Sequence, residues 1–518
     1  TLSAAVGGNE MRYSYATTKI SAPELEIDGV YKLKNSAVTL VTDASRREKG
    51  VHSIYEFVNL GWDDTYFLDI TCRTDWSSTL HPTKWSYTYP SVSASVLLDK
   101  ALKINTPYVN MLKVRASWAN VGNDTSPYSL YDAYSKTSLP GGFTLPSTLK
   151  DAYINPENVE SWEVGFEGKF LNNRLNFDIA LYKNTTTDQI LGVSQSSETG
   201  ATKVMMNAGR VENKGIEISF RLRPVQTRDL LWEINGNWAR NKNKLCELND
   251  GWDPSTPLQT SMGVTIGSRT FVYSYIGEEM HWIYGRDYVR APQGSTCTDE
   301  NGTVIDCSGM PLIDPQTGYP SLIEDPNQRI AKVNPDWKAG FGTSVRYKNL
   351  SFSAQFTAQM GGNSFSVTNF GLSYQGKLKN SLPGREDGLV LKGVNAVDNG
   401  DGTISYRKNN TITENVYIYY NKYQWVRDNT KANTFSTDFL KLKEVRLDYR
   451  FPERWMQKTK FLRSASIGVF ATNLFCITNW PQYDPEAAGV VSGSNIYGGI
   501  ETGSFPMTRT YGFNIKLQ

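Results

Sequence analysis

Long segments in which apolar and polar side chains alternate recur along this chain of 518 residues. In residues 350–360 the alternation holds throughout, and one face carries Leu350, Phe352, Ala354, Phe356, Ala358 and Met360. Residues 216–223 repeat the pattern with Ile216, Ile218, Phe220 and Leu222. A period of two residues is typical of a β-strand with one apolar face.

The length of these segments separates two kinds of β-protein. Strands of ordinary domains run to about 5–6 residues, whereas a tilted strand that crosses a bilayer needs about 9–11. Residues 161–170 and 174–184, joined by the short link 171–173, are of the longer kind. In a membrane barrel the apolar face meets lipid and the polar face meets a water-filled lumen.

The pattern predicts an ordered series of strands along the whole chain. We expect residues 2–6 to be the tail of one strand and place the others at 53–60, 66–76, 90–98, 111–121, 161–170, 174–184, 214–223, 230–242, 263–276, 282–289, 337–347, 350–360, 439–451, 464–474 and 506–517. The apolar positions change parity within 439–451, which predicts a β-bulge at Lys443 and Glu444.

The connections between these strands alternate between short and long. The short ones are residues 61–65, 99–110, 171–173, 224–229, 278–281, 348–349 and 452–463. The long ones are residues 77–89, 122–160, 185–213, 243–262, 290–336, 361–438 and 475–505. Outer-membrane barrels have short periplasmic turns and long outer loops. A soluble β-sandwich or β-propeller, the main alternative, has no reason to keep this parity.

Composition agrees with a β-barrel and excludes several other classes. Charge is balanced, with 54 basic and 52 acidic residues, so we expect no nucleic-acid partner. No run approaches 18 consecutive apolar residues, so no transmembrane helix is expected. Aromatic residues reach 12% and many lie near predicted strand ends, as in interfacial girdles. Packing between the strands of a soluble sheet is the alternative for these rings.

Two of the five cysteines form a candidate disulfide. Cys297 and Cys307 flank a segment that contains Asn301 and Gly302, a pair that favours a hairpin turn. Two strands leaving this turn would bring the thiols together, which predicts a Cys297–Cys307 bond and an oxidising, extracytoplasmic setting. The alternative is two free thiols in a loop.

Catalytic and cofactor-binding motifs do not stand out. His52, His81 and His281 lack the spacing of a metal or general-base pair. Residues 398–402 resemble part of a calcium loop, but the closing position holds Asn409 in place of glutamate, so a polar turn is expected. The same holds for residues 299–302. We therefore predict no enzyme activity, no catalytic residue, no metal site and no cofactor.

The predicted long loops contain clusters of aromatic residues. They lie at Trp85–Tyr89, at Tyr417–Tyr420 with Tyr423 and Trp425, and at Trp480 with Tyr483. Such rings, beside asparagine and aspartate, could bind a glycan, clamp a peptide, contact a partner protein or pack against the loop itself. The sequence assigns no substrate-binding residue among them.

Several motifs resemble one known family. Residues 155–190 (NPENVESWEVGFEGKFLNNRLNFDIALYKNTTTDQI) look like the barrel of TonB-dependent outer-membrane transporters. The segments NAGRVENKGIEISF, WEINGNWARNKNKL, DFLKLKEVRLDYRFPERW, FATNLFCITNWPQYDPEAAG and SFPMTRTYGFNIKLQ follow in order. Together they resemble the SusC/RagA subfamily of Bacteroidetes. The resemblance is weakest over residues 1–35, 288–330 and 362–437.

The resemblance implies an all-β fold, a large antiparallel transmembrane β-barrel. Members of the family have 22 strands around a plug domain, and about 15–16 strands are predicted here, without the plug. We therefore expect residues 1–518 to be the C-terminal part of a TonB-dependent transporter barrel in a bacterial outer membrane.

The function implied is active import of an oligomeric nutrient, an oligosaccharide or an oligopeptide. The expected partners are a SusD-like surface lipoprotein, TonB acting through the N-terminal plug, outer-membrane lipid, and a second copy of the transporter–lipoprotein pair. A passive porin-like channel and a secreted glycan-binding β-protein are the alternatives.

Overall fold

The structure, a computed structural model, consists mostly of β-strands. It describes residues 1–137, 139, 141–194, 198, 200–249, 252–259, 270–299, 301–426, 428–456, 462–487, 498–503 and 505–518. Part of the predicted strand 263–276 therefore lies outside the described residues. None of the helices in these ranges has the length and apolar character needed to cross a bilayer.

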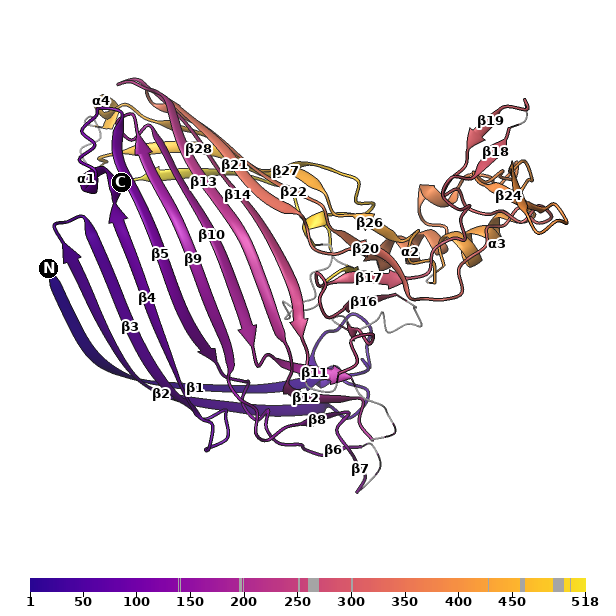
Figure 1. Ribbon diagram of the computed structural model, residues 1–518, viewed down its shortest axis with the longest axis horizontal. Helices are drawn as coiled ribbons and strands as arrows, with labels where there is room; N and C mark the ends of the chain where they lie inside the picture. Colours follow the sequence, from indigo (N-terminus) through magenta and orange to yellow (C-terminus); the bar gives the residue numbers. More distant parts are fainter. Residues whose placement is uncertain are drawn as a thin grey trace. The chain divides into compact units, whose positions relative to one another are not determined.

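Fourteen of the described strands form one large sheet. Figure 1 shows the long strands that build it. In the order in which neighbours are hydrogen-bonded they are β1 (Leu2–Ser21), β2 (Val41–Trp62), β3 (Tyr66–Ser77), β4 (Ser86–Leu97), β5 (Val109–Asn123), β9 (Glu157–Phe170), β10 (Leu175–Thr187), β13 (Arg210–Gln226), β14 (Leu230–Glu247), β21 (Trp337–Tyr347), β22 (Leu350–Met360), β27 (Phe439–Arg450), β28 (Ala465–Thr478) and β30 (Thr510–Leu517). The order follows the chain, and every register determined within this sheet is antiparallel.

Smaller sheets are built from the connections between these strands. They are β6 (Ser135–Lys136) with β7 (Phe143–Thr144), and β11 (Ile190–Ser194) with β12 (Lys203–Asn207) and β8 (Thr148–Lys150). A third consists of β15 (Leu258–Gln259), β16 (Phe271–Ser274), β17 (Trp282–Gly285) and β20 (Gln328–Lys332). A fourth sheet consists of β19 (Val304–Asp306), β18 (Thr296–Thr298), β25 (Ile404–Lys408) and β24 (Val394–Asp398). The fifth consists of β26 (Thr434–Ser436), β23 (Asn363–Ser366) and β29 (Ile500–Glu501).

Helical segments are short and lie between strands. The α-helices are α1 (Leu98–Ala101), α2 (Val367–Tyr374), α3 (Val416–Ile418) and α4 (Glu453–Met456). The 3-10 helices are η1 (Leu33–Asn35), η3 (Lys379–Ser381) and η6 (Pro485–Ala487), and η4 (Tyr419–Gln424) is a π-helix.

The chain divides into two compact units. One comprises residues 1–169, 180–214 and 245–252, and the other residues 170–179, 215–244 and 253–518. In the first unit, β1 and β2 pair in one register from Leu2 with Leu60 to Ser21 with Val41. In the second unit, β21 and β22 pair from Trp337 with Met360 to Tyr347 with Leu350.

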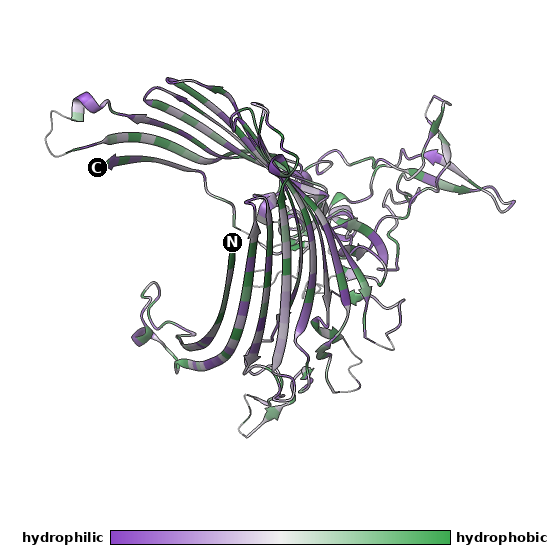
Figure 2. Ribbon diagram, turned by 60° about the vertical axis from the view of Figure 1, so that its left-hand side comes forward, coloured by the Kyte–Doolittle hydropathy of each residue, from purple (hydrophilic) through white to green (hydrophobic). Residues whose placement is uncertain are grey.

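One face of the large sheet is apolar although it is exposed. Large side chains at alternating strand positions remain accessible, including Trp162, Val164, Phe220, Phe341 and Phe352. Figure 2 shows hydrophobic and hydrophilic bands alternating along several strands. Soluble proteins rarely expose contiguous apolar surface of this extent, and a covering of lipid accounts for it.

The opposite face of the sheet is polar. In the first unit, the Nε of Arg73 donates to Asp75 Oδ1 at 2.7 Å and its Nη2 donates to Ser53 Oγ at 2.8 Å. The hydroxyl of Tyr89 donates to the same aspartate. In the second unit, Arg223 Nε donates to Glu233 Oε2 at 2.9 Å. Polar side chains that satisfy one another in this way are typical of a wall that faces water.

The structure confirms the predicted bulge. Phe356 of β22 pairs with Leu442 and its neighbour Gln355 pairs with Glu444, so Lys443 is the additional residue on β27. The pairing of β27 with β28 shifts at the same place. An unpaired residue moves all later side chains to the other face, which explains the change of parity in the sequence.

Two predicted wall strands were placed wrongly. Residues 271–274 and 282–285 are strands β16 and β17, but they belong to the separate four-stranded sheet. Their side chains enter a compact core that contains Val272, Ile283, Phe365 and Ile500. Strands of this length cannot cross a bilayer. β14 and β21 are therefore consecutive described strands of the large sheet, and 278–281 is not a periplasmic turn.

Candidate functional site

The candidate site lies in the second unit, in the connections that contain α2, α3 and η4. The side chain of Ser366 caps α2 and accepts a bond from Asn369 N at 3.0 Å. Asn415 caps α3 in the same way and accepts from Ile418 N at 3.2 Å. Serine and asparagine are favoured at these positions because their oxygens satisfy backbone donors that the first helical turn leaves free.

A buried carboxylate, Glu501, fixes the beginning of α2. It accepts bonds from Ser366 Oγ at 2.8 Å, from Thr368 Oγ1 at 2.6 Å and from Thr368 N at 3.3 Å. A negative charge at the N-terminus of a helix is favourable because the helix dipole and the free N–H groups both face it. Glu501 belongs to β29, which pairs with β23 beside α2.

The aromatic segment of α3 and η4 packs largely against itself. Val416, Tyr420 and Trp425 form a buried cluster, and Leu389 and Phe435 pack against it. The ring of Tyr423 stacks on that of Tyr319 with centroids 5.0 Å apart. Packing within the loops, one of the alternatives for this cluster, therefore describes the surroundings of Tyr420, Tyr423 and Trp425.

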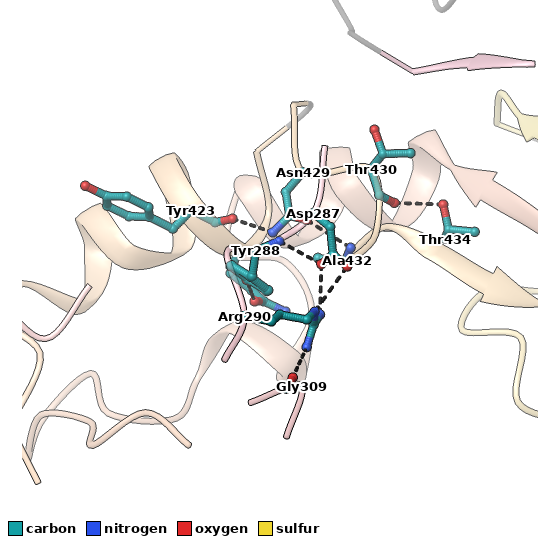
Figure 3. Close-up of polar contacts among 10 residues, drawn as sticks. Asp287, Tyr288, Arg290, Gly309, Tyr423, Asn429, Thr430, Ala432 and Thr434 are labelled. Carbon is teal, nitrogen blue, oxygen red and sulfur yellow. Dashed lines mark hydrogen bonds and ion pairs between the residues drawn. The ribbon is translucent and has the colours of Figure 1, made fainter. Parts of the chain in front are cut away.

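The turn that follows η4 is held by a network of bonds to the backbone (Figure 3). Asn429 Nδ2 donates to Tyr423 O at 2.7 Å, and Asn429 Oδ1 accepts from Ala432 N at 3.1 Å. Beside it, Arg290 donates to Asp287 Oδ1 at 2.8 Å and to Gly309 O at 3.0 Å. The bonds of Asn429 are local and close the turn after η4, whereas those of Arg290 fix the neighbouring segment around residues 287–309.

Tyr288 adds a buried hydroxyl to this support. Its hydroxyl donates to Gln424 Oε1, and the hydroxyl of Tyr419 donates to the same oxygen at 3.1 Å. Burial raises the pKa of Tyr288 well above its ordinary value. The phenol therefore stays neutral and acts as a structural donor at physiological pH.

A cavity of about 660 Å³ opens between α2, the turn after η3, and α3 with η4. Ligand sites in proteins have volumes of roughly 300–1,000 Å³. The end of α2 contributes Tyr374 and Gln375, and the facing segment contributes Glu414, Tyr417 and Asn421. The cavity is open to solvent, since Tyr374 and Tyr417 are 49% and 73% exposed.

A guanidinium group is fixed at the wall of this cavity. Arg385 Nε donates to Ser381 O at 2.8 Å and its Nη2 donates to Ser381 Oγ at 2.9 Å. Gly376 has φ of +70°, and a Cβ there would lie 2.8 Å from Arg385 Nη2. The positive φ favours glycine at this position, and a side chain there would push the end of Arg385 aside.

The structure brings the two predicted disulfide cysteines into one core. Cys297 lies in β18 and Cys307 follows β19, and both are buried with Ala291 and Val394. Asn301 and Gly302 form the turn between the two strands, as predicted. Burial and the contact with Cys297 raise the pKa of Cys307 to about 11. Both are free thiols in the structure, and the bond between them stays a prediction.

The other predicted aromatic clusters differ in their environments. Tyr87 and Tyr89 belong to strand β4, so the predicted loop 77–89 ends at Trp85. Trp480 is buried and packs edge to face against Phe435. Tyr483 is exposed. Only the Tyr417–Tyr420 cluster contributes residues to the lining of the cavity.

Residues 398–402 form the expected polar turn. They connect β24 to β25, and Asp398 Oδ1 accepts from Gly400 N at 2.8 Å. Asp401 Oδ1 accepts from Thr403 N at 2.9 Å. Asn409 is buried and donates to Leu391 O at 3.0 Å, away from the turn.

Several residues of the cavity were not predicted from the sequence. Tyr374, Arg385, Glu414 and Asn421 come from separate turns with no common periodicity. They fall within residues 362–437, where the resemblance to the family is weakest. The density of tyrosine and asparagine there was the available signal, and it did not indicate which residues meet.

The large antiparallel sheet, apolar on one face and polar on the other, defines the class as an outer-membrane β-barrel protein. A family model described as "TonB dependent receptor-like, beta-barrel" matches residues 4–375. The chain belongs to this family. It is an outer-membrane protein with the TonB-dependent receptor barrel fold.

Curated relatives match nearly the whole chain. TonB-dependent receptor P3 of Formosa agariphila is 25% identical over 97% of this chain and 48% of the relative. TonB-dependent receptor SusC of Bacteroides thetaiotaomicron is 24% identical over 92% of this chain and 45% of the relative. The chain thus spans about half the length of the curated relatives it matches. The resemblance to the SusC/RagA subfamily is confirmed.

A solved structure shows the same fold. The match to the structure of the RagAB peptide transporter includes 100% of this chain and 53% of the transporter chain. Its TM-score is 0.73 and the sequence identity is 18%. At this identity the likeness supports the fold and leaves the cargo open.

Proposed function

We propose that this chain forms barrel wall and outer loops of a transporter that imports an oligomeric nutrient across the outer membrane. The observation that carries the proposal is the 14-stranded sheet with one lipid-compatible face and one polar face, in a chain of the TonB-dependent receptor family. The wall provides a water-filled passage, and the loop assembly with its cavity lies in the long connections. The cargo crosses chemically unchanged, so the protein is not an enzyme.

In this proposal TonB transmits the energy that drives import. Relatives that cover the same region carry the name TonB-dependent receptor, which supports coupling through a plug domain supplied by the complete protein. A SusD-like lipoprotein is the proposed outer lid, and two transporter–lipoprotein pairs form the proposed assembly. The name SusC among the relatives supports the lipoprotein partner, and the paired assembly rests on the resemblance to the subfamily alone.

The cargo class under this proposal is a glycan or a peptide. The solved structure with this fold is described as a peptide transporter. The resemblance to the SusC/RagA subfamily implies either an oligosaccharide or an oligopeptide. The chemistry of the cavity distinguishes the two.

Uptake in cells tests the proposal. Cells that express the complete transporter and its lipoprotein should accumulate labelled oligomers, and deletion of TonB should abolish accumulation. Uptake that persists without TonB, together with open single-channel conductance in a planar bilayer, would support a passive channel instead. Pull-down through the lipoprotein tests the partner: recovery of the transporter is expected, and its absence contradicts the pairing.

A further inference from the structure

We propose that the cavity between α2 and the α3–η4 segment binds one sugar unit of a neutral oligosaccharide, and that the cargo is therefore a glycan. The inference rests on the proposed function and names its substrate class. It is carried by the composition of the cavity wall, by the fixed position of its polar groups, and by the absence of peptide-binding features among the residues that line it.

Aromatic rings form much of the wall. Tyr374 and Tyr417 are largely exposed at the opening, whereas Tyr420 is buried and its hydroxyl donates to Pro383 O at 2.9 Å. An exposed ring of this kind is a large, rigid surface with a polar tip. The C–H face of a pyranose stacks on such rings while its hydroxyl groups remain free to form hydrogen bonds.

The polar lining offers both donors and acceptors. Arg385 presents a guanidinium group and Glu414 a carboxylate, and the amides of Gln375, Asn415 and Asn421 stand beside them. A sugar hydroxyl both donates and accepts, so it can satisfy either charged group. The two charges balance, which favours a neutral ligand with many hydroxyl groups over an anion or a cation.

A peptide fits the same wall poorly. Extended peptides usually bind by adding a strand to a free sheet edge or by placing side chains in apolar pockets. The residues that line this cavity come from helices and turns, and Val416 is the aliphatic side chain among them. Val416 is the first residue of α3 and is itself buried in the core, so it gives little apolar surface to a ligand.

The wall is also held in place before any ligand arrives. Arg385 is fixed by two bonds to Ser381, and α2 is fixed by Glu501. Because these groups are already positioned, little conformational entropy is lost when a ligand binds, which favours affinity from few contacts.

The test uses the complete transporter in detergent, labelled with a fluorophore, on an array of neutral oligosaccharides and on a matching array of oligopeptides. Wild-type protein should bind a set of the oligosaccharides. The double variant Tyr374→Ala, Tyr417→Ala should bind them at least about tenfold more weakly, which corresponds to about 1.4 kcal/mol. Tyr134→Ala, at an exposed tyrosine outside the cavity lining, is the matched control and should bind as wild type.

A second variant keeps the inference testable if the double variant does not fold. Glu414 is exposed, so Glu414→Gln should fold normally and leaves Arg385 unbalanced. It should gain binding to uronic-acid oligosaccharides. Unchanged binding by both variants, or loss of peptide binding in the double variant, overturns the inference.

Measuring uptake in cells distinguishes failure of the cavity assignment from failure of the proposed function. If wild-type cells import the bound oligosaccharide only when TonB is present, while the variants import and bind it equally well, the transport function stands and the cavity assignment fails. If import does not depend on TonB, the proposed function fails, whatever the cavity binds.

Discussion

Lys441 is a buried lysine whose ammonium group lies between two carboxylates. Its side chain is 3% exposed, it bonds to Asp484, and it donates to Glu486 Oε2 at 2.6 Å. Lys443 contacts Glu486 from a more exposed position. The two lysines of β27 therefore fix the segment around η6, and the burial of Asp484 depends on Lys441.

We predict that Lys441→Met destabilises this segment. Removing one partner of a buried ion pair leaves the other charge unpaired and costs about 3–5 kcal/mol. Hydrogen exchange of residues 479–487 should rise strongly, whereas Lys443→Met, which keeps the buried pair, should have a much smaller effect. Equal effects of the two variants would contradict the buried pair as the anchor.

His281 is a buried imidazole in an unusual backbone conformation. Its φ is +67°, and its Nδ1 lies 3.4 Å from the amide nitrogens of Asn243 and Asn334. Its Nε2 is buried and has no hydrogen-bond partner among the described residues. Burial lowers the pKa of His281 to about 4, because the charged form cannot be solvated there.

This shift predicts that acid weakens the local structure. Between the ordinary pKa of about 6.5 and about 4, the unfolded segment binds a proton that the folded segment does not. Stability is therefore complete above pH 6.5 and falls by up to about 1.4 kcal/mol per pH unit below it.

Hydrogen exchange of residues 271–285, corrected for intrinsic rates, measures this effect at pH 7 and pH 5. Protection should fall at pH 5. His281→Asn, which retains a residue that tolerates positive φ, should remove the dependence on pH. Protection that is unchanged between the two pH values in the wild type would refute the prediction.

At the scale of elements, the turn between β9 and β10 is strained at a residue that is not glycine. Leu171, Asn172 and Asn173 all have positive φ, at 54°, 56° and 60°. Asparagine tolerates this region, but leucine loses about 1–2 kcal/mol relative to glycine. The residue type at position 171 therefore controls how easily this hairpin forms.

We predict that Leu171→Gly stabilises the hairpin by about 1 kcal/mol and that Leu171→Val destabilises it by a similar amount. Urea-induced unfolding in lipid vesicles would show the two midpoints on opposite sides of the wild type. Midpoints shifted in the same direction would contradict backbone strain as the cause.

The β18–β19 hairpin gives the prediction for the two buried cysteines. Because both thiols lie in one core beside a confirmed turn, we expect them to be oxidised in the mature protein. Intact mass should rise by two hydrogens on reduction, and Cys307→Ala should abolish the change. Alkylation of both thiols in the unreduced protein would exclude the bond.

How well the sequence predicts these strands depends on what covers them. Lys443 was located because β27 keeps one apolar face on both sides of the bulge. By contrast, residues 7–21 of β1 were missed because both faces are exposed, as in most of residues 41–50 of β2. Their apolar and polar residues do not alternate regularly, so the pattern that predicts a strand is absent there.

At the scale of the whole molecule, the apolar face predicts which substitutions the membrane rejects. Phe341 stands near the middle of β21 on this face, stacked on Phe356 with centroids 4.8 Å apart. Ser344 lies on the opposite face of the same strand, paired with Ser353. The two positions therefore lie on the same strand, but one is on its apolar face and the other on its polar face.

We predict that Phe341→Arg lowers the free energy of unfolding by about 2–4 kcal/mol, because an arginine near the bilayer midplane must leave water. Ser344→Arg faces the lumen and should change it by less than about 1 kcal/mol. Urea titration in lipid vesicles compares them. A similar loss for both would argue against lipid on the Phe341 face.

The candidate site was much less predictable than the wall. Tyr417 was singled out for its aromatic neighbours, but Arg385 and Glu414 carry no signal in a segment without periodicity. The positions of these residues depend on supports such as Tyr288 and Glu501, which bond to η4 and α2 from distant parts of the sequence. Local patterns describe strands well, whereas a cavity assembled from several turns is a long-range property.

The bonds from Glu501 to Ser366 and Thr368 also make one wall of the cavity depend on the last part of the chain. Residues 366 and 501 are 135 positions apart. A protein truncated before β29 would keep the sequence of α2 but lose the carboxylate that holds the start of this helix. Damage near the C-terminus would therefore reach the cavity without touching any residue that lines it.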